Sequence, residues 1–211
     1  MALKFAREMH VRCTFMQPVL GTKPNDPEIH SKFVASKAPD AKTMAQEIAA
    51  IGAKEYEEEH KTVFAKMEDG TPFLYSYMVQ GFLKEAARTM KKVPGSRTSS
   101  AVAYLKTIDN FMEVVGPYDD DERVIPMFIP IDLDLKATDN QRPLRASTPQ
   151  GERVALAHSE EAPKGTYIEF TIKLLRASDE PLVREWLDYG ELKGMGQWRN
   201  SGLGRFEWEE I

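Results

Sequence analysis

Apolar and polar residues alternate along several short stretches of this 211-residue chain, a pattern typical of half-buried β-strands. Residues 9–16 alternate and are rich in β-forming residue types, so we expect a first strand there. Asp69-Gly70 is a strong turn signal and predicts a hairpin around it. The turn at residues 160–165 predicts a second hairpin between the strands that flank it. The remaining strands are expected at residues 62–67, 72–79, 111–115, 123–129, 152–158, 165–175 and 203–209.

Helical patterns alternate with these strands. Asp26 and Pro27 are expected to open a helix that runs to about residue 37, with Asp26 as the N-cap. A second, charged helix is expected at about 40–60. Further helices are expected at residues 80–92, 99–107 and 180–189, whereas 141–146 is expected to be an edge strand or a loop. The apolar face of the 180–189 helix carries Leu182, Val183, Trp186 and Leu187. This order predicts one compact α+β domain over residues 1–211, with an inserted helical region near 26–60.

The composition is that of a soluble globular protein, with 42% apolar and 29% charged residues. No apolar run is long enough for a transmembrane helix, and residues 1–8 lack the apolar region of a signal peptide. Cys13 is the single cysteine, which excludes an internal disulfide framework, and we expect it in the core. We therefore expect a cytoplasmic protein without membrane contact. The net charge of −5 argues against a broad duplex-binding surface, so any nucleic acid must meet a local patch.

Residues 194–204, which we name the glycine loop, read G-x-G-x5-G-x-G and lead into the last strand. Glycine permits positive φ and close approach of a ligand, and successive amides can form an anion-binding concavity. Trp198 adds a stacking surface and Arg199 a cation, a combination that suits a phosphate plus a base. The alternative is a purely structural turn. The spacing is not that of a Rossmann or Walker sequence. The candidate phosphate-binding residues are Gly194, Gly196, Gln197, Trp198, Arg199, Asn200, Ser201, Gly202 and Gly204.

Basic residues elsewhere extend this candidate site. Lys84 and Arg88 lie on neighbouring turns of the expected 80–92 helix, and Arg142 and Arg145 lie in the 141–146 segment. We predict that these four side chains and Arg199 share one surface and form a groove for a nucleic acid.

Three segments together resemble the RAMP superfamily of CRISPR proteins. The first strand is followed by residues 18–22 (PVLGT), residues 81–88 are similar to the family's G-S-S-L-K-G-x-x-R segment with Phe82 and Glu85 as departures, and the glycine loop comes last. Residues 153–175 also resemble the hairpin before the family's last helix. The resemblance implies a ferredoxin-like (RRM-like) antiparallel sheet with a helical insertion at about 23–60, and RNA binding. The whole chain is also similar to small uncharacterised proteins of Firmicute phages and prophages.

Catalytic chemistry has few candidates in this sequence. Processing members of the family often use a histidine, and His30 is a candidate general base although no partner for it is identifiable. No H-x-x-x-H or C-x-x-C spacing exists, so we expect no metal and no cofactor. Asp132, Asp134 and residues 119–121 are either a Mg²⁺ site or, as we expect, ordinary surface carboxylates.

These observations predict a non-catalytic, phage-encoded protein that binds single-stranded RNA or an oligonucleotide in a bacterial host cell. One alternative is an anti-defence protein that sequesters a short or cyclic signalling nucleotide, or that mimics a CRISPR subunit and engages a CRISPR or defence protein. A metal-independent endoribonuclease of the repeat-processing type is another. The last is an interaction protein, including a homo-oligomer, whose glycine loop is only structural.

Overall fold

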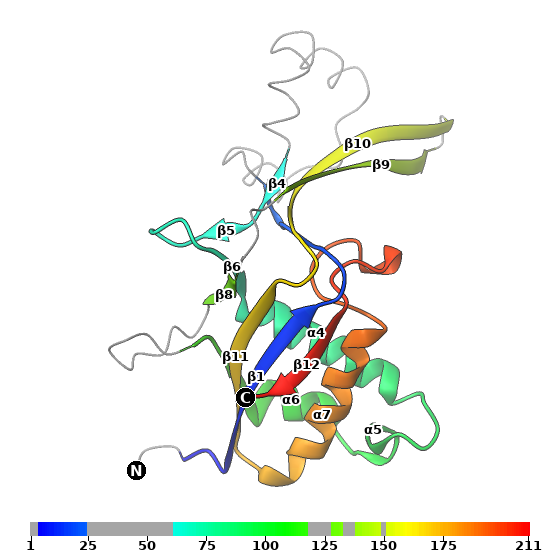
Figure 1. The fold of residues 1–211 in the computed structure, drawn as a ribbon. Coiled ribbons are helices and arrows are strands. Elements are labelled where there is room, and N and C mark those ends of the chain that lie inside the picture. The colour runs from blue at the N-terminus through cyan, green and yellow to red at the C-terminus, as the bar shows by residue number, and fades with distance from the viewer. Residues whose placement is uncertain (1–3, 25–60, 118–127, 133–137, 149–150) are drawn as a thin grey trace.

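An antiparallel sheet covered on one face by helices forms the lower body of the molecule in Figure 1. The computed structural model describes residues 4–24, 61–117, 128–132, 138–148 and 151–211, with residues 143–156 described by their backbone alone. The strand order is β12-β1-β11-β8-β6-β5, and β7 also pairs with β11. The strands are β1 (Arg7–Phe15), β5 (Ala65–Lys66), β6 (Pro72–Tyr75), β7 (Met112–Val115), β8 (Phe128–Asp132), β11 (Tyr167–Leu174) and β12 (Phe206–Glu210). The predicted α+β class with antiparallel sheets is confirmed.

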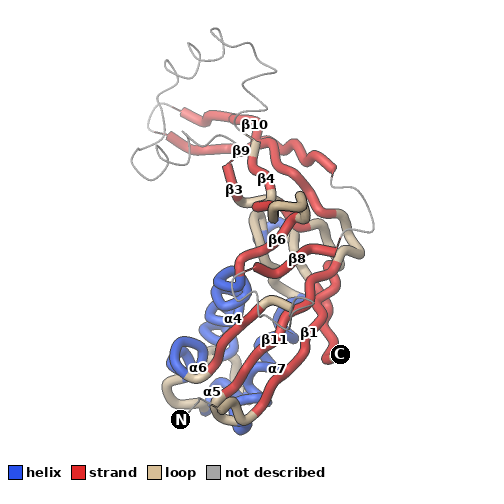
Figure 2. The backbone as a smooth tube through the Cα atoms, turned by 90° about the vertical axis from the view of Figure 1, so that its left-hand side faces the viewer, coloured by secondary structure: helices blue, strands red, loops and turns tan. Residues whose placement is uncertain are grey.

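Alternation along β1 decides which face of this sheet is buried. Met9, Val11, Cys13 and Phe15 have no exposed surface and face the helices. The helices on that face are α4 (Ser76–Met90), α5 (Arg97–Ser100), α6 (Tyr104–Asn110) and α7 (Glu180–Asp188) (Figures 1 and 2). The described residues also form three short 3-10 segments: η1 (Ala177–Asp179), η2 (Tyr189–Glu191) and η3 (Arg199–Ser201). The core placement predicted for Cys13 and for the apolar face of α7 is confirmed, and burial raises the pKa of the Cys13 thiol.

A second sheet extends from the first, at the top of Figure 1. It contains β2 (Val19–Leu20), β3 (Lys23–Pro24), β4 (Thr62–Val63), β9 (Thr138–Thr148) and β10 (Gly151–Ala162). β9 and β10 form a long antiparallel hairpin, and β10 also pairs antiparallel with β2 and parallel with β4. This hairpin projects away from the helices (Figure 2).

The hairpin expected between residues 152–158 and 165–175 is wrong, and so is the alternative of a loop at 141–146. β10 pairs with β9 from Gly151 to Glu161, whereas β11 pairs with β1, β7 and β8. Pro143 had left 141–146 open as an edge strand or a loop, because proline cannot donate to a sheet, and the edge-strand alternative is confirmed by β9. Of the described strands only β10 pairs with β9, so the missing N–H of Pro143 is tolerated at that edge.

Other boundaries differ by a few residues. The hairpin predicted around Asp69-Gly70 is present as β5–β6, but β6 ends at Tyr75 and α4 begins at Ser76 rather than near residue 80. The helix expected at 99–107 is divided into α5 and α6 because Ala103 takes a left-handed conformation with φ 55°. The helices expected at 27–37 and 40–60, and with them the insertion near 26–60, lie outside the described residues. Among the described helices, none has the length and apolar character needed to cross a membrane.

A charged cluster joins β1, α7 and β12 and should make stability depend on pH. Arg7 donates to Glu180 at 2.8 Å, Arg184 donates to Glu180 at 2.8 Å, and both arginines also contact Glu210. The hydrogen bonds from Arg7 and then Arg184 lower the pKa of the Glu180 carboxyl. A carboxyl whose pKa is lower in the folded state stabilises the fold at pH values above its unfolded pKa of about 4.3. That stabilisation is lost as the pH falls through the pKa of the folded state.

We therefore expect Glu180→Gln to lower the free energy of unfolding at pH 7 by less than about 1 kcal/mol, because the pair lies near the surface. In urea unfolding, this difference from the unchanged protein should shrink as the pH falls below about 4. A difference that stays constant down to acid pH would contradict the assignment of the ion pair.

Candidate functional site

The two ends of the glycine loop meet backbone to backbone. The amide of Met195 donates to the carbonyl of Gly204 at 3.0 Å, and the amide of Gly204 donates to the carbonyl of Pro18 at 2.8 Å. A Cβ on Gly194 would lie 1.9 Å from the carbonyl carbon of Gly204, and one on Gly204 would lie 1.9 Å from the carbonyl oxygen of Met195. Glycine is required at both positions because no side-chain atom fits there.

The middle of the loop contains residues in the left-handed backbone conformation. Gly196, Trp198 and Gly202 have φ of 86°, 57° and 87°. Trp198 opens η3, and this conformation is rare for a bulky residue. Left-handed and right-handed residues in succession turn neighbouring amides toward one side, the arrangement that binds anions. The amides of Gln197 and Trp198 have no hydrogen-bond acceptor in the part of the chain that the structure describes.

Arg142 lies between the β9–β10 hairpin and the glycine loop. Its guanidinium donates to Ser159 Oγ at 2.9 Å and to Gln197 Oε1 at 3.2 Å, and its Cζ lies 4.6 Å from the centre of the Trp198 ring. The residue is only 5% exposed, its Nε has no hydrogen-bond partner among the described residues, and burial lowers its pKa. All these partners are neutral, and the described residues place no carboxylate against it. The protein therefore holds a buried positive charge directly beneath the loop.

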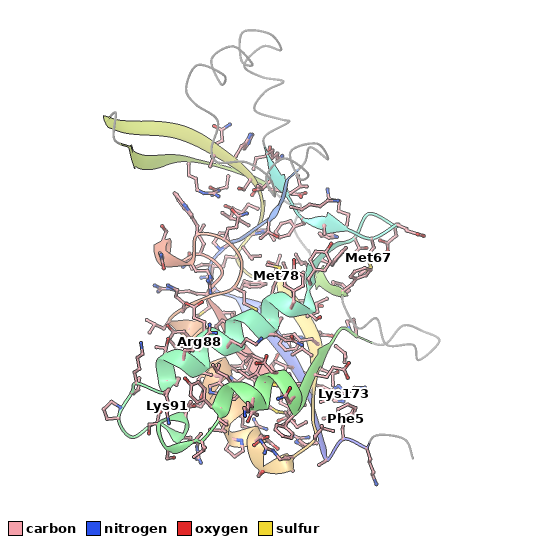
Figure 3. All side chains as sticks on the ribbon, turned by 180° about the vertical axis from the view of Figure 1, so that it is seen from behind. Phe5, Met67, Met78, Arg88, Lys91 and Lys173 are labelled. Carbon is pink, nitrogen blue, oxygen red and sulfur yellow. The ribbon has the colours of Figure 1, made fainter. Side chains whose placement is uncertain are left out.

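Two of the other predicted cations carry counter-ions of their own. Lys84 Nζ lies 2.5 Å from Asp109 on α6, and Arg199 forms an ion pair with Glu85 on α4. Glu85 is one of the residues in which the 81–88 segment departs from the RAMP pattern, and here it ties the glycine loop to α4. Arg88 is exposed on α4 (Figure 3).

The remaining candidate residues are Asn200, Ser201 and Arg145. Asn200 accepts a hydrogen bond from Lys193, whereas Ser201 donates its amide to the carbonyl of Trp198. Arg145 lies opposite Val154 in the hairpin, and its side chain lies outside the described part. Ser159 was missed in the sequence; strand alternation does place it on the same face of the hairpin as Arg142. Arg205, which directly follows the loop, was also missed.

Of the titratable residues considered for catalysis or Mg²⁺ binding, only Asp132 lies in the described part of the chain. His30, Asp134 and residues 119–121 lie outside the described residues, and Asp132 accepts a hydrogen bond from Tyr167. His158 Nε2 lies 3.8 Å from Asp139. Within the described ranges, no three histidine, cysteine or carboxylate side chains are placed to hold a metal ion.

Two surface hollows have no glycine-loop residue in their lining. One, of about 410 Å³, is lined by residues that include Asp132, Tyr167 and Glu169. The other, of about 430 Å³, is lined by Thr14, Asp188, Glu191, Glu207, Trp208 and Glu209. Carboxylates in both hollows would repel a phosphate. The glycine loop is therefore the better candidate for an anionic ligand.

Comparisons with known proteins give similarity in structure but not in sequence. No family model and no curated protein matches the chain. The crystal structure of Cmr6 from Pyrococcus furiosus is similar at 11% identity with a TM-score of 0.47, covering 97% of this chain and 98% of that one. A chain in the cryo-EM structure of the Type III-B Cmr-beta bound to cognate target RNA is similar at 10% identity with a TM-score of 0.48. This match covers 97% of the present chain, which spans 60% of the length of that Cmr-beta chain.

Proposed function

We propose that this protein binds single-stranded RNA or a related oligonucleotide at the surface formed by the glycine loop and the β9–β10 hairpin. The observation that supports this most strongly is the guanidinium of Arg142, which is 5% exposed and contacts only neutral groups among the described residues. A buried charge without a counter-ion is unfavourable, and an anionic ligand would supply the missing charge.

The local charge also answers the objection raised by the acidic composition. The net charge is −5, yet the field of one buried guanidinium is strong at short range because little water screens it. A short single strand needs only such a local patch, whereas a duplex needs a broad basic surface.

Arg142 and the residues of the glycine loop have distinct roles in this proposal. Arg142 packs against one face of the Trp198 ring and fixes its orientation, so the half-buried indole offers a preorganised surface for a base. The amides of Gln197 and Trp198 donate to a phosphate of the backbone. Fixing these groups before binding reduces the entropy that binding costs.

We expect Arg142→Met to weaken binding of a fluorescein-labelled single-stranded RNA roughly tenfold, because an interaction with a charged group contributes a free energy of that order to binding. The melting temperature should stay the same or rise, since methionine fills a similar volume and removes the burial cost of the charge. Fluorescence anisotropy and thermal unfolding monitored by circular dichroism measure the two effects. Arg97→Met, which removes an exposed cation on α5, is the matched control.

The unchanged protein must bind this RNA for the proposal to stand. Absence of binding, or release of a defined small nucleotide on heating the purified protein, would replace it with nucleotide sequestration or with a structural loop. Shortened RNA recovered after incubation without metal would indicate an endoribonuclease.

A further inference from the structure

Arg205 directly follows the glycine loop, where its backbone is held by hydrogen bonds and its side chain has no partner among the described residues. Its carbonyl accepts hydrogen bonds from the amides of Met16 and Gln17 at 2.8 and 3.3 Å. Its Nε is buried without a partner, and across the described residues its guanidinium has no hydrogen bond or ion pair. A buried N–H without an acceptor is unfavourable, so this arrangement is expected only where a ligand or solvent completes it.

The other partly buried arginines in the described part of the chain are compensated by carboxylates. Arg7 and Arg184 pair with Glu180, Arg12 pairs with Glu169, and Arg199 pairs with Glu85. Arg142 and Arg205 have no such partner among the described residues, and both lie against the glycine loop. Among the described arginines that are not exposed, the two without a carboxylate partner thus both lie against the glycine loop.

Gly202 lies next to the guanidinium of Arg205. A Cβ on Gly202 would lie 3.5 Å from each of Cζ, Nε and Nη2 of Arg205. An added Cβ would thus be in ordinary van der Waals contact with the guanidinium on the side of Nε and of Nη2, one of its two terminal nitrogens. Unlike Nε, the two terminal nitrogens of Arg205 are not buried. Both terminal nitrogens of Arg142, in contrast, already donate to Ser159 and Gln197.

We propose that Arg205 forms a phosphate subsite with Gly202, and that Arg205 rather than Arg199 contacts the backbone of the ligand directly. The inference rests on the proposed function and goes beyond it by assigning the contact to one residue. The fork of an arginine matches two oxygens of one phosphate, which a lysine cannot reproduce. Arg142 then acts from beneath the loop, as a positioning residue for Trp198.

The test compares Arg205→Met, Arg205→Lys and the control Arg97→Met. Binding of a labelled single-stranded RNA is measured by fluorescence anisotropy over a salt series. We expect Arg205→Met to weaken binding about tenfold and to reduce the salt slope by about 0.7, the value for one phosphate contact on a single strand. Arg205→Lys should keep the salt slope and recover only part of the affinity. Arg97→Met should change neither quantity. If Arg205→Met does not fold, the lysine variant alone decides. Weaker binding at an unchanged salt slope supports a two-point contact between Arg205 and one phosphate, whereas unchanged binding means that Arg205 makes no contact.

Inorganic pyrophosphate separates this inference from the proposed function. If RNA does not bind but pyrophosphate raises the melting temperature of the unchanged protein and not of Arg205→Met, the subsite stands and RNA binding falls. If RNA binds the unchanged protein and both Arg205 variants equally well, the subsite is wrong and the proposed function stands. If neither RNA nor pyrophosphate binds, both are wrong.

Discussion

Replacing Gly204 with alanine is expected to destabilise the protein by more than about 3 kcal/mol, because a new atom would overlap the main chain. Its Cβ would lie 1.9 Å from the carbonyl oxygen of Met195, and its φ of 69° is unfavourable for alanine. The backbone cannot easily move away, since hydrogen bonds to Met195 and Pro18 hold both sides of Gly204. A thermal melt should show a fall in melting temperature of roughly 10 °C or no cooperative transition.

Gly95→Ala is the matched control for this prediction. Gly95 has a φ of 85° but nothing within 4 Å of a Cβ, so alanine there carries only the conformational cost of about 1 kcal/mol. The difference between the two variants isolates the backbone contact. If Gly204→Ala melts at the same temperature as Gly95→Ala, the closed geometry of the loop is incorrect.

The sequence was sufficient for the elements whose burial follows a simple period. β1 alternates buried residues with partly or fully exposed ones, and α7 buries Val183, Trp186 and Leu187 on one face, so both were predicted near their true positions. The pairing of β10 was not predictable in this way. Strand periodicity states which face of a strand is buried but not which strand lies beside it, and Pro143 argued against the partner that the structure shows.

In the glycine loop, the spacing of the glycines predicts a special backbone conformation but does not show what each glycine is needed for. Its four glycines are needed for two reasons. Gly194 and Gly204 permit the backbone contact, and Gly196, Gly202 and also Gly204 take left-handed conformations. Spacing alone does not separate these reasons. The same limit applies to charge, because the sequence contains Glu85 and Arg199 but cannot show that they neutralise each other 114 positions apart. The cations without a carboxylate could be found only once side chains far apart in sequence were placed together.

Removing the indole of Trp198 is expected to reduce RNA affinity by about 1–3 kcal/mol, that is roughly 5- to 150-fold, because a stacked base loses its aromatic surface. The ring is half-buried and packs on Arg142, in contrast to Trp186, which is fully buried in the core. Trp198→Ala should therefore lower the melting temperature far less than the loss of a core tryptophan, which costs about 3–5 kcal/mol. Trp208→Ala, which removes a half-buried indole on β12, is the matched control and should leave RNA affinity unchanged.

A double-mutant cycle of Trp198→Ala and Arg142→Met tests how the two residues cooperate. If Arg142 acts by holding the indole, its removal should matter less once the indole is gone, and the two effects on RNA affinity should not add. Additive effects would show that Arg142 acts on the ligand by its charge alone. A large fall in melting temperature with unchanged affinity per folded molecule would instead make Trp198 a packing residue, and the glycine loop would lose its role as the binding site.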